Sequence, residues 1–541
     1  MLLTELAEVS AAVAGTPARL AKIEQIAGLL RRVPPGEISV AVAFLSGELR
    51  QRQIGVGYAA LSGHFRLAGP QDGPGLESQH PAQPELTLTE TDAVFAAIGA
   101  QTGAGSQAGR RRLLDGLLGR ATPAERDFLV RLLSGDLRQG ALEGVMSESI
   151  ARAAGVPAAA IRRAHQLSGS LAVTAEAALR GEGALEALSG LRMQVGVPVR
   201  PMLAAAAPSI EAALERVSPA AVEWKIDGIR IQVHKDGAEI RVFTRTLDDI
   251  TARVPEISEA ARALTARAVV LDGEAVALRP DGRPQPFQVT SARAASQGGA
   301  AGQRSQVPLT AFLFDLLHRD GTDLIDEPGS ERYRQLAQVA PPGLLIPRLV
   351  TADPAAAQEF FGDAVGRGHE GVVVKSLDAT YVAGRRGSEW IKVKPRHTLD
   401  LVILAAEWGH GRRRGVLSNL HLGARDPATG GLVMLGKTFK GLTDQMLAWQ
   451  TERLLELADP PRQPPGPAER AGLYGTVRVR PELVVEIAFD GVQASRRYPG
   501  GLALRFARVL RYRPDKSAAE ADTIDSLRAI WGSGAAEGEP G

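Results

Sequence analysis

The sequence Glu223-Trp224-Lys225-Ile226-Asp227-Gly228-Ile229-Arg230 lies near the middle of the chain and decides how the rest is interpreted. After it, apolar residues alternate over 229–233, which predicts a strand. We expect Lys225 at the end of one strand, Asp227-Gly228 in a tight turn and Arg230 at the start of the next strand. A glycine next to the lysine leaves room for a ligand phosphate. The alternative is an ordinary hairpin with one exposed lysine.

Lysine is rare in this chain. Only nine of the 63 Lys and Arg residues are lysines, so arginine is the usual basic residue. Arginine does not lose its proton and cannot act as a nucleophile, whereas a lysine amine can do so when its pKa is lowered. A lysine at this turn therefore indicates that its amine takes part in a reaction. Chance retention is the alternative, and it is sufficient for Lys22 or Lys235.

Length and composition limit the class of protein. A chain of 541 residues accommodates about three domains, and 44% hydrophobic with 23% charged residues is typical of a soluble globular protein. The net charge of +2 means that any nucleic-acid surface is a local basic patch. The absence of cysteine excludes disulfides and cysteine-bound zinc and is consistent with the cytoplasm. We see no signal peptide and no bilayer-spanning run, so we expect no membrane association.

Residues 1–195 show helical periodicity and an internal repeat. The sequence 44–51 matches 132–139 at an offset of 88, which indicates two duplicated helical halves joined by a flexible segment at 69–85. In each half a Ser-Gly turn precedes Leu-Arg-Gln. We expect Arg50 and Arg138 to lie beside free amides at a helix start, where DNA phosphates bind. The alternative is a capped helix with a solvated arginine.

The remainder of the chain is rich in strand patterns, with a boundary near 196. We predict helices over 20–30, 110–118 and 128–133, strands over 240–243, 268–271, 310–317 and 371–375, and loops at 296–306 and 459–470. From 398, short strands at 401–405, 432–435 and 483–489 with Gly-rich turns predict a small β-barrel. The predicted domains are thus 1–195, 196–397 and 398–531, followed by a disordered tail at 532–541.

The segment Gly431–Thr438 fits the P-loop pattern, but we do not interpret it as one. A P-loop is a glycine-rich loop between a strand and a helix. The intervening residues here are apolar and strand-like, so a strand with a basic end is expected.

Four further clusters follow Lys225 at predicted strand ends: Val270–Glu274, Phe312–Leu317, Glu370–Lys375 and Trp390–Pro395. Together they supply an aromatic ring for a base, a carboxylate for ribose hydroxyls, lysines for phosphates and a carboxylate for a divalent metal. Each cluster alone has an ordinary interpretation as a turn or a solvated face. Five in this order favour a nucleotide pocket.

These five clusters resemble the ordered nucleotidyltransferase motifs of ATP-dependent DNA ligases. Residues 505–516 are similar to that family's last motif, 198–203 to the entry into its catalytic domain, and the Leu-Arg-Gln repeats to its helical DNA-binding domain. The resemblance, which is closest to the bacterial form, implies a multidomain α+β fold. Its parts would be a helical DNA-binding domain, a mixed α/β nucleotidyltransferase (ATP-grasp-like) domain and a C-terminal OB-fold β-barrel.

The resemblance also implies a role for individual residues. ATP adenylates Lys225, the AMP passes to the 5′-phosphate of a nick, and the 3′-hydroxyl then displaces it. The other implied positions are Glu223 at the adenine edge, Phe314 stacked on adenine, Arg230 and Glu274 at the ribose, Arg245 and Arg386 (or the adjacent Arg385) on phosphates, Lys375 and Lys392 at the α-phosphate, Glu370 at Mg²⁺, and Arg508, Arg511, Asp515 and Lys516 at pyrophosphate. Lys394 shares a strand face with Lys392 and joins the lysines that meet the phosphates.

Two other classes of protein remain as alternatives. An RNA ligase or a capping-type guanylyltransferase would share the lysine chemistry, but the duplicated helical region favours duplex DNA. A catalytically silent DNA-binding protein would have no need of Lys225, Glu274 or Glu370. We therefore expect an enzyme that uses ATP and Mg²⁺ to seal nicked double-stranded DNA, acting as a monomer that closes around its substrate. The sequence leaves repair, replication and recombination open.

Overall fold

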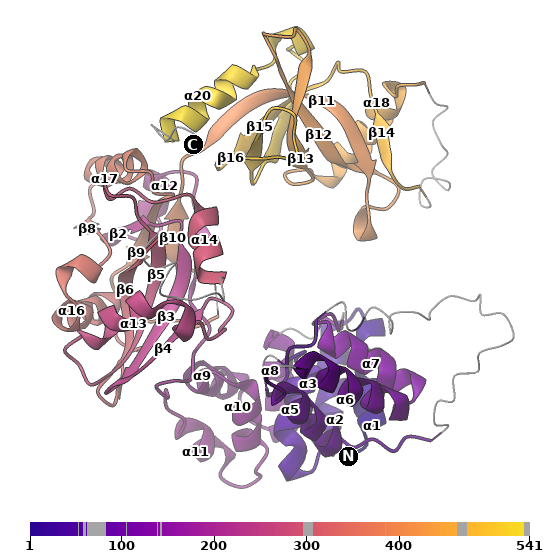
Figure 1. Cartoon of the computed structure of the whole chain (residues 1–541), viewed down its shortest axis with the longest axis vertical. Coiled ribbons are helices and arrows are strands. Elements are labelled where there is room, and N and C mark those ends of the chain that lie inside the picture. Colours follow the sequence, from indigo (N-terminus) through magenta and orange to yellow (C-terminus); the bar gives the residue numbers. More distant parts are fainter. Residues whose placement is uncertain are drawn as a thin grey trace, which may run out of the picture.

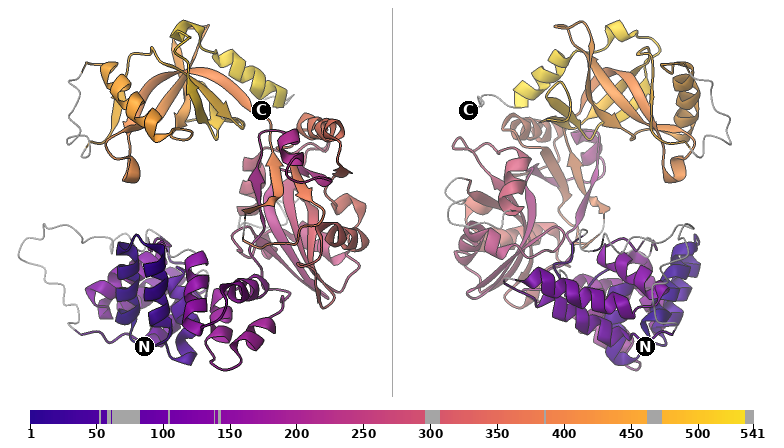
Figure 2. Two further views of the ribbon diagram at one scale, coloured as in Figure 1. Left: turned by 180° about the vertical axis from the view of Figure 1, so that it is seen from behind. Right: turned by 45° about the vertical axis from the view of Figure 1, so that its right-hand side comes forward.

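The chain forms three bodies arranged as an open C (Figure 1). A helical body, a two-sheet body and a strand-rich body follow one another, and the views in Figure 2 show the opening between the first and third. This computed structural model describes residues 1–51, 54–57, 61, 83–103, 105–137, 139–140, 143–295, 307–384, 386–461 and 473–534. None of the helices in these ranges is both long and apolar enough to cross a membrane.

The first body consists of helices that share one apolar core, from Leu3 to Leu188. The predicted helices at 20–30, 110–118 and 128–133 are confirmed as α2, α6 and α7. The helices are α1 (Leu3–Gly15), α2 (Arg19–Leu30), α3 (Ile38–Leu45), α5 (Leu88–Gly99), α6 (Ser106–Arg120), α7 (Pro123–Leu133), α8 (Glu143–Ala154), α9 (Ala158–Ser168), α10 (Leu171–Ala178) and α11 (Ala184–Ser189).

The two Ser-Gly turns of the repeat adopt the same conformation, but they end helices rather than start them. Gly47 follows α3 with φ +73° and Gly135 follows α7 with φ +70°, the left-handed geometry that commonly terminates helices. The next amides, of Glu48 and Asp136, donate back to Ala43 and Arg131 carbonyls at 2.9 and 3.0 Å. The expectation that these turns start helices was therefore wrong. The predicted linker lies outside the described residues from 69 to 82.

The second body contains two sheets, and the predicted strands at 240–243, 268–271, 310–317 and 371–375 are confirmed within it. One sheet has the order β1-β10-β9-β2-β8, from β1 (Leu203–Ala206), β10 (Arg386–Val393), β9 (Gly371–Ser376), β2 (Ala220–Lys225) and β8 (Arg348–Thr351). The other has the order β4-β3-β5-β6-β7, from β4 (Glu239–Thr244), β3 (Ile229–Asp236), β5 (Ala268–Ala277), β6 (Leu309–Arg319) and β7 (Thr322–Asp323). The helices of this body are α12 (Ile210–Leu214), α13 (Pro255–Arg262), α14 (Phe287–Ala295), α16 (Gly329–Val339) and α17 (Pro354–Gly366).

Lys225 ends β2 and Arg230 lies at the start of β3, as predicted, but the two strands do not form a hairpin. β2 pairs with β8 and β9, whereas β3 pairs with β4 and β5, so the residues between them cross from one sheet to the other. Gly228 clears space for protein rather than for a phosphate. A Cβ at Gly228 would lie 2.3 Å from the Ala275 carbonyl oxygen of β5. The glycine thus permits the crossing segment to approach β5 closely where β3 begins.

The third body is built on a curled sheet with the order β13-β12-β11-β15-β18, and β14 pairs with β11. Its elements are β11 (His397–Trp408), β12 (Leu417–Arg425), β13 (Leu432–Thr438), α18 (Asp444–Glu456), β14 (Thr476–Arg478), β15 (Val484–Phe489), β16 (Gly491–Ala494), β17 (Leu502–Arg505), β18 (Arg508–Tyr512) and α20 (Ile524–Gly534). The strands predicted at 401–405, 432–435 and 483–489 are confirmed. The segment that fits the P-loop pattern forms strand β13, as expected from its apolar residues.

The predicted closed barrel is corrected to open sheets. No ladder joins β13 to β18 among the described residues; the Val509 amide, which donates to the Lys440 carbonyl at 2.9 Å, bridges this edge. The tail prediction also changes, because α20 continues through residues 532–534, while 535–541 lie outside the description. The predicted loop at 296–306 also lies outside the described residues, as does the predicted loop at 459–470 from residue 462 onward.

Candidate active site

A cavity of about 160 Å³ lies between the two sheets of the second body. Strand alternation directs Glu223 and Lys225 to its side of β2, while Val222 packs on the opposite face in a core shared with α17. Of the predicted site residues, those that line the cavity are Glu223, Lys225, Arg230, Arg245, Glu274, Phe314, Lys375 and Lys392. Residues far apart in the sequence thus meet as the motif order predicted.

Lys225 is held by an acid that reaches it from the neighbouring strand end. Its Nζ forms an ion pair with Oε2 of Glu370, and the other Glu370 oxygen accepts from Lys394 Nζ. Burial opposes ionisation of Glu370, but the two ammonium groups outweigh it and hold its pKa below the usual range. Lys394 also lies 3.3 Å from Asp490 of the third body. The predicted nucleophile and metal ligand are therefore in direct contact.

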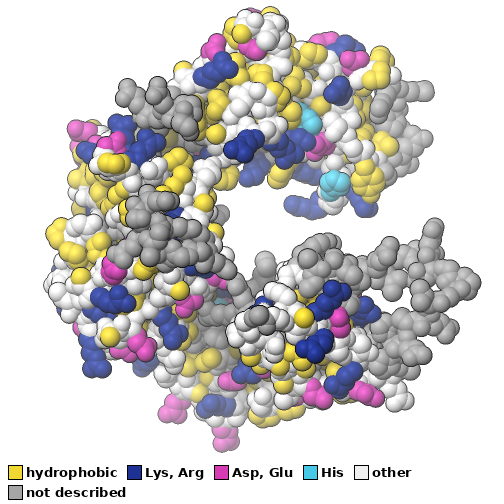
Figure 3. Space-filling model, in the orientation of Figure 1, with side chains coloured by type: hydrophobic (Ala, Val, Ile, Leu, Met, Phe, Trp, Pro, Cys, Tyr) yellow, Lys and Arg dark blue, Asp and Glu magenta, His cyan; other side chains and the backbone are white. Residues whose placement is uncertain are grey.

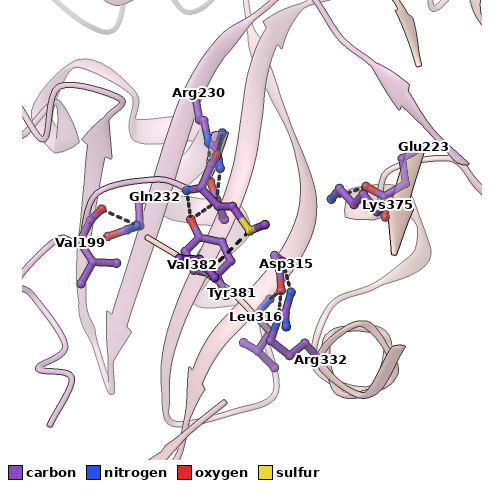
Figure 4. Close-up of polar contacts among 12 residues, drawn as sticks. Val199, Glu223, Arg230, Gln232, Asp315, Leu316, Arg332, Lys375, Tyr381 and Val382 are labelled. Carbon is purple, nitrogen blue, oxygen red and sulfur yellow. Dashed lines mark hydrogen bonds and ion pairs between the residues drawn. The ribbon is translucent and has the colours of Figure 1, made fainter. Parts of the chain in front are cut away.

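Lys375 lies on the deep side of the cavity. Its Nζ is 2.5 Å from Glu223 Oε2, an ion pair shown in Figure 4, and it lies over the rings of Phe314 and Trp390 at 4.4 and 4.1 Å. Burial lowers the pKa of Lys375, and the Glu223 carboxylate opposes that change. Among the described residues, Glu223 Oε1 is buried without a hydrogen-bond partner and lies 3.7 Å from Arg348 Nη1. This oxygen retains the capacity to accept a hydrogen bond from a ligand.

Arg230 is anchored at the wall of the cavity. It donates to both carboxylate oxygens of Asp272, at 2.9 and 2.6 Å, and to the Met202 carbonyl at 2.7 Å. The Tyr381 hydroxyl donates to the same carboxylate at 2.7 Å (Figure 4). Asp272 and Tyr381 orient the arginine. Tyr381 had no recognisable sequence signal, because it lies in a stretch without strand or helix periodicity.

Glu274 lies opposite Arg230 on the adjacent strand of the second sheet. Burial raises the pKa of its carboxyl to about 7, against the opposing effects of Lys225 and Arg230. Glu274 therefore changes its charge near neutral pH, at the position where we predicted contact with ribose.

Of the second-body arginines predicted to bind phosphates, the structure describes the side chain of Arg245 only. Arg245 is exposed at the cavity rim and also borders a second cavity, of about 700 Å³, at the junction with the helical body. Arg386 begins β10, but its side chain is outside the described part of the chain, as is Arg385 entirely.

The last-motif residues Arg508, Arg511, Asp515 and Lys516 do not line the cavity in this arrangement. Arg511 donates to Glu486 and Lys516 to Asp400, each at 2.6 Å. The other members also have partners within the third body: Arg508 with Asp490 at 3.1 Å and Asp515 with Arg513 at 2.6 Å. Contact with a bound nucleotide would require a rotation of this body.

The helical body holds one predicted DNA contact within the described residues. Arg50 is about half exposed, and its Nη1 lies 2.9 Å from Asp92 Oδ2 of α5. Arg138 lies outside the described residues.

Comparisons with known proteins agree with these features. Family models match residues 76–151 (DNA ligase N terminus), 201–394 (ATP dependent DNA ligase domain) and 413–516 (ATP dependent DNA ligase C terminal region). A probable DNA ligase of Mycobacterium sp. (strain KMS) is 56% identical, with 98% of this chain and 99% of the relative covered. One from Anaeromyxobacter dehalogenans (strain 2CP-C) is 54% identical, with 98% and 100% covered.

A solved structure named Pmar-Lig_Pre has a similar fold, with a TM-score of 0.56 at 17% identity over 94% of this chain and 99% of that one. The matches favour a DNA ligase over an RNA ligase, a capping-type guanylyltransferase or a silent DNA-binding protein. The chain belongs to the family of ATP-dependent DNA ligases, and its activity is the sealing of nicks in DNA.

Proposed function

We propose that Lys225 is the nucleophile that carries AMP between ATP and DNA. The observation that supports this most directly is the position of its amine, at the mouth of a cavity that also presents an aromatic ring, Phe314, and the ionisable carboxyl of Glu274. The amine nitrogen forms a bond to the α-phosphorus of ATP, the bond to the β-phosphate breaks, and pyrophosphate leaves. The amine proton is lost to solvent.

Two transfers complete the reaction. An oxygen of the 5′-phosphate at the nick attacks the AMP phosphorus, and Lys225 leaves as the amine. The 3′-hydroxyl then attacks the 5′-phosphorus and releases AMP with formation of the phosphodiester. Lys225 is thereby regenerated for the next cycle.

Side chains that surround Lys225 bind and orient the nucleotide. Phe314 stacks on adenine, Glu223 accepts from its edge, and Glu274 accepts from the ribose hydroxyls. Positive charge for the phosphates comes from Lys375, Lys392, Lys394, Arg245 and Arg386. Arg511 and Lys516 add charge for the leaving pyrophosphate in the first step, when the third body rotates toward the cavity. These assignments rest on the placement of the lining residues and on the family.

The family also implies Mg²⁺, and Glu370 is suited to hold it. Mg²⁺ at nucleotide sites takes one or two carboxylates and completes its shell with phosphate oxygens and water. Glu370 supplies one such carboxylate, and both of its oxygens already meet cations, the ammonium groups of Lys225 and Lys394. Bound there, the ion would neutralise phosphate charge. The Lys225 amine attacks in its unprotonated form.

The DNA substrate is proposed to be nicked duplex, bound by one copy of the chain. The C-shaped arrangement leaves an opening between the first and third bodies, and Figure 3 shows Lys and Arg side chains along the third body's edge of it. Basic side chains along a concave edge suit the phosphates of a duplex. Closure of the helical body over the DNA would complete the ring.

Self-adenylation tests this proposal. The protein, freed of bound AMP with pyrophosphate, is incubated with α-labelled ATP and Mg²⁺ and analysed on a denaturing gel. We expect label on the wild type and none on Lys225→Ala or Lys225→Arg. The arginine variant is the sharper control, because it keeps the charge that faces Glu370 but cannot act as a nucleophile. Lys235→Met removes a lysine of β3 that does not line the cavity and should label normally. Label on Lys225→Arg would assign the nucleophile elsewhere.

A further inference from the structure

We propose that Trp224 and His369 are a positioning pair that sets the placement of Lys225 relative to Glu370. The two rings stack at the edge of the site, with centroids 4.6 Å apart and planes tilted by 35°, and Trp224 also borders the cavity. Trp224 immediately precedes the lysine, and His369 immediately precedes the acid. The inference rests on the proposed function, which gives Lys225 and Glu370 their roles.

The two strand ends carry different contacts on their two faces. On the cavity face, the Lys225 amine pairs with the Glu370 carboxylate. On the opposite face, Trp224 contacts Phe360 of α17 at 6.3 Å between centroids, and His369 stacks on the same indole. The Glu370 amide donates to the Lys225 carbonyl at 2.9 Å and joins the two faces. A shift of either ring is therefore transmitted to the next residue along the chain.

The backbone ladder alone does not supply this alignment. The residue paired with Lys225 on β9 is Gly371, which has φ +134° and no side chain. A Cβ there would lie 2.2 Å from the Val393 carbonyl oxygen, so the glycine is required by the close approach of β10. Gly371 offers Lys225 no cross-strand side-chain contact, so such a contact between these two strand ends must come from residues adjacent to the pair. The Trp224–His369 stack provides that contact.

The surroundings would not compensate for a lost ring. A cavity of about 370 Å³ borders both Trp224 and His369 on the outer side, between Arg283 and Arg367. Truncation of either ring would enlarge this space instead of drawing in packed neighbours. Among the described residues, His369 Nδ1 and Trp224 Nε1 are buried without hydrogen-bond partners. Because those atoms contribute no hydrogen bond, a phenyl ring should be able to replace the imidazole.

The test compares His369→Ala and His369→Phe by single-turnover self-adenylation over a range of ATP and Mg²⁺ concentrations. We expect the alanine variant to be slower at saturating ATP by about tenfold or more, since misplacement of a reacting group by about 1 Å can cost on the order of a hundredfold. Its half-saturating Mg²⁺ concentration should rise several-fold. Half-saturation by ATP should stay within about twofold, because base and ribose contacts lie elsewhere. The phenylalanine variant should recover most of the rate.

His234→Ala is the matched control for loss of a buried histidine. His234 lies in the same body, is 1% exposed against 6% for His369, and packs edge-on against Phe243 at 5.1 Å. Its Nδ1 accepts a hydrogen bond from the Gly196 amide and its Nε2 donates to Gln232 Oε1, so its loss should destabilise the body at least as much. Measured below their unfolding midpoints, His234→Ala should label at the wild-type rate.

Three results would overturn the positioning role: a normal rate and Mg²⁺ dependence in folded His369→Ala, a phenylalanine variant as slow as the alanine variant, or an equal loss in His234→Ala. Failure of the proposed function looks different. In that case the wild type itself takes no label, or Lys225→Arg takes it, and the positioning role falls with the nucleophile.

Discussion

The guanidinium of Arg505 lies 2.9 Å from Asp227 Oδ2, which joins β17 of the third body to the segment that follows Lys225. A second ion pair, Lys394 with Asp490 at 3.3 Å, crosses the same boundary. With these contacts made, Lys516 of the last motif is paired with Asp400, away from the cavity. The observed orientation therefore separates the last motif from the nucleotide site, and the two ion pairs stabilise that separation.

Arg505→Ala should slow nick sealing by adenylated enzyme and leave self-adenylation unchanged or faster. Both partners are about a quarter exposed, and ion pairs at such sites contribute about 1 kcal/mol or less, so we expect a two- to fivefold effect. Single-turnover sealing of a labelled nick measures it. Arg480→Ala removes an arginine paired within the third body, with Glu482 at 2.9 Å, and should have neither effect. A slower self-adenylation in Arg505→Ala would contradict the assignment.

Phe314→Ala should raise the ATP concentration needed for self-adenylation and leave Lys225 competent. The ring lines the cavity, and Lys375 Nζ lies 4.4 Å from its centroid, so truncation removes a stacking surface and a cation–π contact. Each is worth about 1 kcal/mol, and together they predict a rise in half-saturating ATP of about thirtyfold. Phe314→Tyr retains the ring face and should lie near the wild type. An unchanged ATP dependence in the alanine variant would remove Phe314 from the nucleotide site.

Arg50→Ala should weaken binding to nicked duplex and reduce its salt dependence by about one counterion, with self-adenylation unaffected. In the structure Asp92 competes for this arginine, at 2.9 Å. Asp92→Asn is therefore an informative partner variant, because it removes the competing charge and should leave affinity equal or higher. Binding titrations at several salt concentrations measure both. Equal losses in the two variants would show that the ion pair only supports the fold.

The sequence was sufficient for the site where the chemistry depends on residue type at strand ends. Lys225, Glu274, Phe314 and Lys375 lie on one cavity because alternation and motif order fix their faces. The sequence was insufficient where the structure depends on which strands pair with one another. Alternating residues around Gly228 predict two strands, but nothing local reveals that they enter different sheets.

The Ser-Gly turns show the same limit. Their sequence suits either end of a helix, and only the positive φ of Gly47 and Gly135, with amides that bond back to the preceding turn, identifies a C-terminal end. Tyr381 and Arg505 were missed or misplaced for a related reason. Tyr381 contacts Asp272 and Arg505 contacts Asp227, and each partner is more than a hundred residues away in the sequence. A single sequence does not show that such distant residues meet in the fold.

Glu274 should make ATP use depend on pH near neutrality. Burial raises its pKa from 4.5 to about 7, so the carboxyl is mostly neutral below pH 7 and ionised above it. An ionised carboxylate accepts stronger hydrogen bonds from ribose hydroxyls than a neutral acid. Half-saturating ATP in self-adenylation should therefore fall as the pH rises from about 6 to about 8. Glu274→Gln cannot ionise and should show a smaller change, which also corrects for the titration of ATP itself. Parallel pH profiles for the two proteins would exclude Glu274 from the ribose contact.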